Sequence, residues 1–243
     1  MVGVKNVMRT ELSVEVYGLD ELRQLDGPAL MVANHASHLD TAVLLSTLPA
    51  TRRRRTAVGV AGDYFFTNWL RSSASAMAFS TFPMQHSGDV LASTSARLLA
   101  DGWTVVIFPE GTRSRDGFVG PFRMDAAEIA IACQVPVIPV GILGTYAAMP
   151  RGSNWPPPGR PRVGVRYGPP IRSRPGETST DFAPRIFEAV KQLLAEDAAS
   201  WWQTQRGSAE VPEPPASSWR RIWQQSDPPV KGGKPQDVQI WRR

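Results

Sequence analysis

The stretch PALMVANHASHLDTAVLLSTL, residues 28–48, contains the change of period that decides the fold. Its first part, PALMVANH, is almost continuously apolar up to Asn34, which is typical of a strand buried on both faces. Its last part, DTAVLLSTL (40–48), has the apolar spacing of a helix. A buried strand that leads directly into a helix is the unit of parallel sheets, so this stretch predicts an α/β fold.

The rest of the chain repeats this alternation of strands and helices. Further strands are expected in ELSVEVYGL (11–19), TAVGVAG (56–62), WTVVIFP (103–109), VPVIPVGIL (135–143) and PRVGVRYGPPI (161–171), with a strand or loop in FSTFPM (79–84). Helices are expected at NWLRSSASAMAF (68–79), GDVLASTSARLLA (88–100), MDAAEIAIAC (124–133) and DFAPRIFEAVKQLLAEDAASWWQTQ (181–205). We therefore expect a mostly parallel central sheet flanked by helices on both faces.

The composition changes near residue 206. Residues 1–205 are expected to form one domain, whereas 206–243 are rich in Pro, Trp and Arg and show no period. Such a segment is expected to be an extended or disordered tail. Its tryptophans beside arginines have two readings, a contact with a membrane interface or packing on the domain surface.

The charge balance narrows the class of partner. The net charge is +5, mostly from arginine, which suits nucleic acid, an anionic membrane surface or a phosphorylated small molecule. The four arginines at 52–55 have three readings: a solvated face, a contact with membrane phosphates, or a nucleic-acid patch. No nucleic-acid motif accompanies them, so no nucleic-acid partner is expected. The single cysteine, Cys133, forms no intrachain disulfide, and three scattered histidines give no metal-ligand spacing, so no metal is expected.

Membrane crossing has one candidate segment. No charged residue lies between Glu128 and Arg151, which is long enough for a span. Pro136 and Pro139 interrupt it, however, and interior prolines break helical hydrogen bonds. The amino-terminal residues contain no apolar signal-peptide core. We expect no transmembrane helix, and any membrane association is expected to be peripheral.

The segment NHASHLD (34–40) joins the first strand to its helix. Ser37 is placed as a helix N-cap with Asp40 three residues later, close to a capping box. His35 lies at the strand-to-helix turn, where an open α/β sheet binds ligand. Asp40 can then accept a hydrogen bond from one ring nitrogen of His35, which leaves the other nitrogen as a base. His38 is expected on a different side of the helix start.

A second group of polar residues, FPEGTRS (108–114), follows the strand at 103–109. Gly111 permits a tight turn and a close approach of the backbone. Glu110, Thr112 and Arg113 are therefore displayed at a strand end. They form either a charged surface turn with Glu110 paired to Arg113, or a phosphate site in which Arg113 and Thr112 act as donors.

These two segments and VPVIPV (135–140) together resemble a family. They are similar to the NHxSxxD, FPEGTRS and VPxxPV blocks of the glycerolipid acyltransferases, with a similar spacing of about 75 residues between the first two. The nearest type is the bacterial 1-acylglycerol-3-phosphate acyltransferase. The resemblance covers roughly residues 12–190, and the ordered set of three blocks is highly specific.

The resemblance implies a reaction and a set of residues. His35, oriented by Asp40, would take the proton of a glycerol hydroxyl, and the alkoxide would attack an acyl thioester without an acyl-enzyme. The donor would be acyl-CoA or acyl-carrier protein as co-substrate, and no cofactor is implied. The family's acceptor-binding block carries over to Glu110, Gly111, Thr112 and Arg113.

The chain departs from the family pattern in two places. A middle block that ends in an acceptor-binding arginine reads FSTFPMQHSGD here, with Gln85 or His86 at the expected position. Possible substitutes are Arg71, Arg97 and the arginines at 52–55. The family's Phe-Lys-x-Gly reads PFRMDAA, so Arg123 replaces the lysine as a candidate phosphate contact and Asp125, in place of glycine, is expected to be a helix N-cap.

The implied function is transfer of a fatty acyl group to a lysophospholipid, with 1-acyl-sn-glycerol 3-phosphate as the first choice of acceptor. Other acceptors remain open, namely a lysophosphodiester, glycerol 3-phosphate or a non-phosphorylated alcohol. A non-catalytic lipid- or phosphate-binding module is the alternative from a different class. The expected partners are the lysolipid acceptor, the thioester donor and an anionic membrane surface, with the protein peripheral on the cytoplasmic side.

Overall fold

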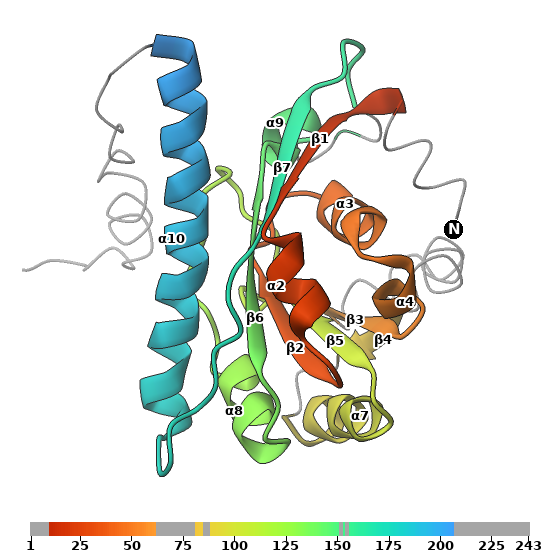
Figure 1. The fold of residues 1–243 in the computed structure, drawn as a ribbon, viewed down its shortest axis with the longest axis vertical. Coiled ribbons are helices and arrows are strands. Elements are labelled where there is room, and N and C mark those ends of the chain that lie inside the picture. The colour runs from red at the N-terminus through yellow and green to blue at the C-terminus, as the bar shows by residue number, and fades with distance from the viewer. Residues whose placement is uncertain (1–9, 62–80, 85–87, 151–152, 154–155, 207–243) are drawn as a thin grey trace, which may run out of the picture. The chain divides into compact units, whose positions relative to one another are not determined.

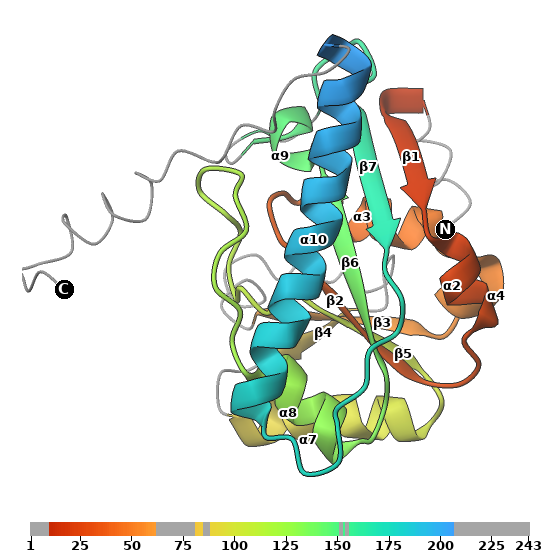
Figure 2. The same ribbon diagram turned by 60° about the vertical axis from the view of Figure 1, so that its left-hand side comes forward.

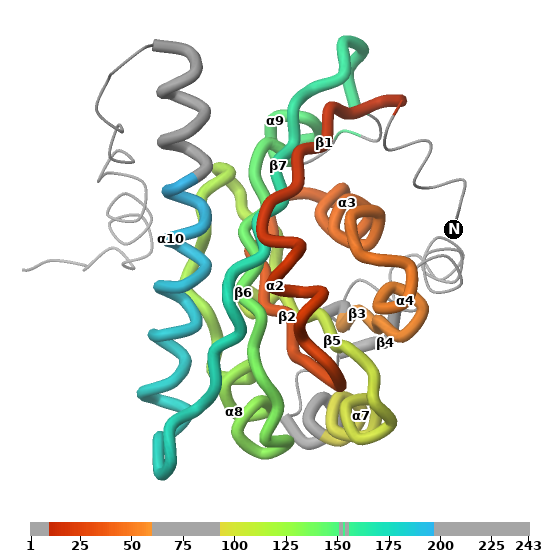
Figure 3. The backbone as a smooth tube through the Cα atoms, in the orientation of Figure 1, coloured from red at the N-terminus to blue at the C-terminus, as the bar shows by residue number. Residues whose placement is uncertain are grey.

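The computed structural model describes residues 10–61, 81–84, 88–150, 153 and 156–206 (Figures 1 and 3). One compact unit extends to Trp201, and a second unit begins at Trp202 and is described only as far as Arg206. The helix expected at 68–79 lies outside the described residues. So does the tail expected at 206–243, apart from Arg206.

A seven-stranded sheet forms the centre of the first unit, in the order β1-β7-β6-β2-β5-β3-β4 (Figure 1). The strands are β1 (Ser13–Tyr17), β2 (Ala29–Ala33), β3 (Thr56–Ala61), β4 (Thr81–Met84), β5 (Thr104–Ile107), β6 (Val137–Leu143) and β7 (Arg162–Tyr167). All neighbouring strands are parallel except β6 and β7, which are antiparallel. The prediction of a mostly parallel α/β sheet is confirmed.

Strand β2 is buried on both faces, as its apolar run predicts. Its side chains alternate between two core clusters, with Ala29, Met31 and Ala33 in one and Leu30 and Val32 in the other. Because successive strand residues point to opposite faces, the two clusters lie on opposite sides of the sheet. Complete burial of one leucine or valine side chain contributes about 1.5–3 kcal/mol.

Helices cover both faces (Figure 2). Helices α2 (Leu19–Gln24), α3 (Leu39–Thr47) and α9 (Thr145–Ala148) contribute to the first cluster, and α7 (Gly88–Ala100), α8 (Asp125–Ala132) and α10 (Ser179–Arg206) to the second. The chain therefore leaves β2 for α3 on one face and leaves the adjacent β5 for α8 on the other. This divergence is the topological switch point at which open α/β sheets bind ligands.

Three short helices were not expected from the sequence: α2, α9 and α4 (Ala50–Arg53). Each has at most six residues, too few to show a helical period. Only Leu22 is buried in α2, and no residue is buried in α4.

One of the four arginines at 52–55, Arg52, has a structural role. The guanidinium of Arg52 donates to the carbonyl oxygens of Leu25 and Gly27 and to Oγ1 of Thr104. The peptide N–H of Thr104 in turn donates to the carbonyl oxygen of Arg55. The cluster therefore lies at the amino ends of β3 and β5, and Arg52 joins the segment before β2 to the start of β5.

Candidate active site

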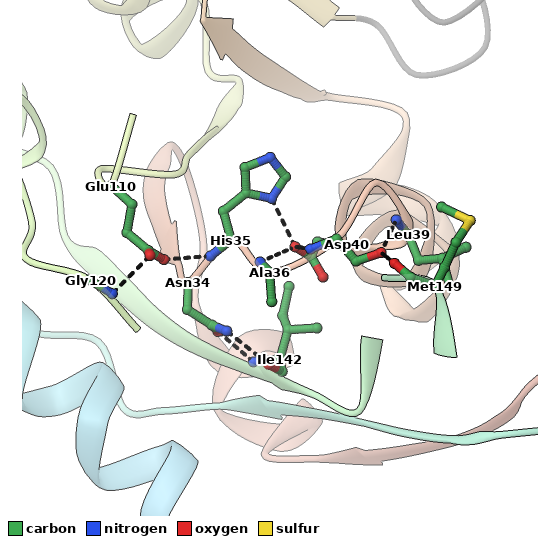
Figure 4. Close-up of polar contacts among 10 residues, drawn as sticks. Asn34, His35, Ala36, Leu39, Asp40, Glu110, Gly120, Ile142 and Met149 are labelled. Atoms are coloured by element: carbon green, nitrogen blue, oxygen red, sulfur yellow. Dashed lines mark hydrogen bonds and ion pairs between the residues drawn. The ribbon is translucent and has the colours of Figure 1, made fainter. Parts of the chain in front are cut away.

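Two adjacent strands deliver the site residues to the same edge of the sheet. Strands β2 and β5 are parallel, with Val32 paired to Ile107. His35 and Glu110 each follow their paired residue by three positions, so they emerge at equivalent places beyond the carboxyl ends. The peptide N–H of His35 donates to Oε1 of Glu110 at 2.6 Å (Figure 4). The structure thus brings together the two segments that the sequence singled out.

His35 and Asp40 form a hydrogen-bonded pair. The Nδ1 atom of His35 lies 2.8 Å from Oδ2 of Asp40, whose side chain is fully buried (Figure 4). When Nδ1–H donates to this carboxylate, the lone pair of the neutral ring is on Nε2, at the opposite side of the ring. The imidazole keeps 21% of its surface exposed, so a substrate can reach the ring. This arrangement has the parts of a general base and its orienting acid.

Asp40 also holds the turn that carries His35. The same Oδ2 atom accepts the peptide N–H of Ala36 at 2.7 Å and that of Ser37 at 2.8 Å. Three donors therefore converge on one oxygen, while Oδ1 is buried with no partner among the described residues. One carboxylate thus fixes both the imidazole ring and the backbone on which the ring is mounted.

The prediction that Ser37 is the N-cap of this helix is wrong by one residue, but half of the predicted capping box is present, because Oδ2 of Asp40 accepts the N–H of Ser37. Helix α3 begins at Leu39, its N-cap is His38, and no side-chain cap hydrogen bond is present. Ser37 Oγ instead donates to the carbonyl oxygen of Met149 at 2.7 Å and accepts the N–H of Leu39 at 3.3 Å. The serine joins the turn to the end of α9, more than a hundred residues later, and a local capping pattern cannot reveal such a partner.

Glu110 is a half-buried link between loops. Its Oε1 accepts the N–H of His35, and its Oε2 accepts the N–H of Gly120 at 2.9 Å. Burial raises the pKa of this carboxyl to about 7. The two backbone hydrogen bonds and the nearby His35 lower the pKa, and Asp40 raises it. The carboxylate is therefore not confined to a solvated surface turn.

Gly111 and Arg123 are in close contact. Gly111 has φ +69°, and a Cβ atom built on it would lie 2.8 Å from Cζ of Arg123, so the guanidinium rests against its backbone. The N–H of Arg123 donates to the carbonyl oxygen of Pro109 at 3.0 Å. Thr112 is exposed and Arg113 partly exposed on the same segment. A positive φ and a close neighbour together explain why glycine occupies position 111.

The prediction that Asp125 caps a helix is also wrong. Helix α8 begins at Asp125 and its N-cap is Met124, with no side-chain cap hydrogen bond. Asp125 is therefore an acidic residue in the first turn, where a carboxylate still interacts favourably with the helix dipole.

Three further contacts of the site were missed in the sequence. The amide side chain of Asn34 donates to and accepts from the backbone of Ile142, both at 2.8 Å, which extends the pairing of β2 with β6 (Figure 4). The ring of Phe108 stacks on His35 with 4.3 Å between centroids. The N–H of Ser114 donates to the carbonyl oxygen of His35 at 2.8 Å. Asn34 and Phe108 stand first in the two motif segments, which is the signal that could have indicated them.

Only some of the candidates for replacing the middle-block arginine lie within the described residues. Gln85, His86 and Arg71 lie outside the described residues. Arg97 lies near the carboxyl end of α7, just before β5 begins, and the arginines at 52–55 lie at the same amino edge of the sheet. These cations are therefore at the opposite end of the strands from His35. Among the described residues, no three His, Cys, Asp or Glu side chains gather as a metal site would require.

Comparisons with known proteins point to one family. A family model described as Acyltransferase matches residues 13–143. The chain is 34% identical over 142 residues to a chloroplastic 1-acyl-sn-glycerol-3-phosphate acyltransferase of Brassica napus, covering 58% of this chain and 40% of that protein. It is 30% identical over 177 residues to 1-acyl-sn-glycerol-3-phosphate acyltransferase alpha of Mus musculus, covering 69% of this chain and 57% of that protein. The chain thus spans about half the length of these curated relatives.

A solved structure shares the fold. The 1-acyl-sn-glycerophosphate acyltransferase of Thermotoga maritima matches with a TM-score of 0.64 and 24% identity, covering 80% of this chain and 78% of that one. The family model covers more than half of the present chain and includes both the His35–Asp40 turn and the Glu110 segment. The chain belongs to the acyltransferase family.

Proposed function

We propose that the protein transfers a fatty acyl group from an acyl thioester to the free hydroxyl of a lysophospholipid, most simply 1-acyl-sn-glycerol 3-phosphate. The observation that carries the proposal is the His35–Asp40 pair at the carboxyl edge of the sheet, 2.8 Å apart and fixed by a buried carboxylate. The relatives named 1-acyl-sn-glycerol-3-phosphate acyltransferases support the choice of acceptor.

In the proposed reaction His35 is the general base. Its Nε2 atom takes the proton of the acceptor hydroxyl as that oxygen forms a bond to the thioester carbonyl carbon. The imidazolium that results is stabilised by the carboxylate of Asp40. When the tetrahedral intermediate collapses, the carbon–sulfur bond breaks and the thiolate takes the proton back from Nε2. The acyl group moves directly to the acceptor, and the donor is acyl-CoA or acyl-carrier protein.

The acceptor phosphate is assigned to the segment after β5. Thr112 supplies a hydroxyl, and Arg113 and Arg123 supply guanidinium groups, which bind phosphate oxygens in pairs. Gly111 contributes by admitting the Arg123 guanidinium against its backbone. In this assignment Arg113 and Arg123 together replace the single arginine of the family's middle block.

We further propose that the protein works at an anionic membrane surface. Phe118 and Met124, which are 47% and 42% exposed, belong to the connection between β5 and α8 that also carries Glu110. Arg115 is exposed on the same connection. Exposed apolar side chains on one connection with an exposed arginine suit a lipid interface. None of the helices in the described part of the chain combines the length and apolar content of a membrane-spanning helix.

An acceptor panel tests the proposal. Purified protein is given acyl-CoA or acyl-carrier protein with lysophosphatidic acid, a lysophosphodiester, glycerol 3-phosphate or a non-phosphorylated alcohol. We expect the fastest transfer to lysophosphatidic acid and loss of about 10²–10⁴ in kcat for His35→Ala. His38→Ala, a change of the same kind at an exposed histidine three residues away, is the matched control and should keep the wild-type rate. Equal transfer by wild type and His35→Ala, or lipid binding without turnover, would exclude the proposed mechanism.

A further inference from the structure

We infer that Glu110 is a positioning residue, which holds the catalytic turn and the 114–120 loop in register through two backbone amides, and is not a ligand of the acceptor. The inference rests on the proposed acyl transfer and deepens it, since it reassigns one residue of the segment that the family resemblance gives to acceptor binding.

The geometry fixes the backbone of His35 on both sides. Its N–H donates to Oε1 of Glu110 at 2.6 Å, and its carbonyl oxygen accepts the N–H of Ser114 at 2.8 Å. The ring is separately held by Asp40. Both peptide groups of the catalytic histidine are therefore tied to the connection that follows β5, and Glu110 provides one of these two ties.

The second oxygen of Glu110 fastens the far end of the same connection. Oε2 accepts the N–H of Gly120 at 2.9 Å. A Cβ atom at position 120 would lie only 3.2 Å from this oxygen, so the carboxylate packs tightly against the glycine backbone. One side chain thus joins three points of the chain: the end of β2, the end of β5 and the residue ten positions later.

The two amides favour the ionised form of the side chain. Two N–H donors need two acceptor oxygens, and a carboxylate presents a charged acceptor to both. A protonated acid places a hydrogen on one of these oxygens, and a glutamine places an NH₂ group there. Glutamine brings a donor to face a donor, so one of the two hydrogen bonds is lost, and protonation replaces a charged acceptor by a weaker neutral one.

This preference makes the tie sensitive to pH in the neutral range. Burial raises the pKa of Glu110 to about 7, so a substantial fraction is protonated just below neutrality. The titratable groups that act on its charge are His35 and Asp40, whereas the guanidinium of Arg123 lies against the neighbouring Gly111. As the pH falls through about 7, the turn that carries His35 is expected to loosen.

A loosened turn should affect the chemical step more than acceptor binding. A displacement of about 1 Å at a catalytic group is enough to cost roughly a hundredfold in rate, because the reacting atoms leave their productive approach. The acceptor phosphate, held by other side chains, should bind nearly as before. A ligand role for Glu110 predicts the opposite, a higher acceptor KM at an unchanged kcat.

The variant Glu110→Gln separates these roles, with Asp116→Asn as the matched control. Asp116 also accepts hydrogen bonds within the same connection, but its carboxylate is exposed. At pH 8.5 we expect Glu110→Gln to lower kcat by about 10- to 100-fold, with acceptor KM within about threefold of wild type, and Asp116→Asn to change neither. At pH 6 the ratio of wild-type to Glu110→Gln kcat should fall to about 2- to 10-fold, because with a pKa of about 7 only roughly a tenth of Glu110 stays ionised.

Amide hydrogen exchange gives a readout that does not depend on acyl transfer. In the Glu110→Gln variant the N–H groups of His35 and Gly120 should lose at least about tenfold in protection, and Asp116→Asn should leave both unchanged. In the wild type, protection of these two amides relative to Leu44 N–H should fall as the pH drops through about 7. This measurement tests the inference even if the Glu110→Gln variant does not fold.

Each outcome counts for or against the inference. A tenfold rise in acceptor KM at constant kcat, or unchanged protection of both amides, would overturn it. A wild type that shows no acyl transfer but the expected exchange pattern would overturn the proposed function and leave the positioning role of Glu110 in place.

Discussion

Replacement of Asp40 by asparagine tests the centre of the site most directly. Three donors meet at Oδ2 of Asp40: Nδ1–H of His35 and the peptide N–H groups of Ala36 and Ser37. An asparagine with its carbonyl oxygen in that place keeps all three hydrogen bonds. The opposite orientation would set an NH₂ group against three donors, so the first orientation is expected. The turn and the tautomer of His35 should therefore survive.

The expected loss of activity then comes from charge. A hydrogen bond to a charged acceptor contributes about 1 kcal/mol more than one to a neutral acceptor, which sets a lower limit of roughly fivefold. Unit charges about 4 Å apart interact with about 4 kcal/mol at an effective dielectric constant near 20, which sets an upper limit of roughly 10³. Since a rate falls tenfold for each 1.4 kcal/mol or so, we expect Asp40→Asn to lower kcat by about 10²-fold.

The same structure predicts a smaller effect of Asp40→Asn on stability than of Asp40→Ala. The new NH₂ group takes the place of Oδ1, which is buried with no partner among the described residues, at a cost of about 1–3 kcal/mol. Alanine instead leaves the N–H groups of Ala36 and Ser37 buried without an acceptor, at about 1–3 kcal/mol each. Acyl transfer rates and urea unfolding of both variants provide the measurements. A kcat for Asp40→Asn within threefold of wild type, in a folded protein, would refute the general-base mechanism.

Three further predictions follow from single contacts. Asn34→Ala should lower the free energy of unfolding by about 2–5 kcal/mol, because the buried N–H and carbonyl of Ile142 lose their partner; a loss below 1 kcal/mol in urea unfolding would contradict this. Gly111→Ala should raise acceptor KM, because the new methyl group displaces the Arg123 guanidinium, and should destabilise the protein by roughly 1–2 kcal/mol, because position 111 has a positive φ. Unchanged steady-state kinetics would exclude the assignment of Arg123 to the acceptor phosphate. Phe118→Asp should weaken binding to vesicles of anionic phospholipid in a sedimentation assay, while acyl transfer to a short-chain monomeric acceptor stays unchanged. Equal vesicle binding by the variant and the wild type would show that Phe118 does not contribute to membrane binding.

The local pattern predicted most of the fold. The apolar run before Asn34 and the spacing after it correctly indicated a buried strand and a helix, because side-chain period is a property of adjacent residues. The same reasoning placed His35 and Glu110 each at the end of a buried strand, and the pairing of β2 with β5 then brings the two together. It placed the N-cap of α3 one residue too early and was wrong for Asp125, which lies in the first turn of α8.

The sequence by itself determined the class of the fold, the family and the segments in which the chemistry lies, because each is recorded in neighbouring residues or in ordered motifs. The tertiary structure alone decided how these segments hold one another: Asn34 to Ile142, Ser37 to Met149, and Glu110 to both His35 and Gly120. Most of these partners are 75 to 112 residues apart along the chain. Such contacts depend on strand order and register, which bring distant backbone groups within hydrogen-bonding distance and which no local pattern specifies.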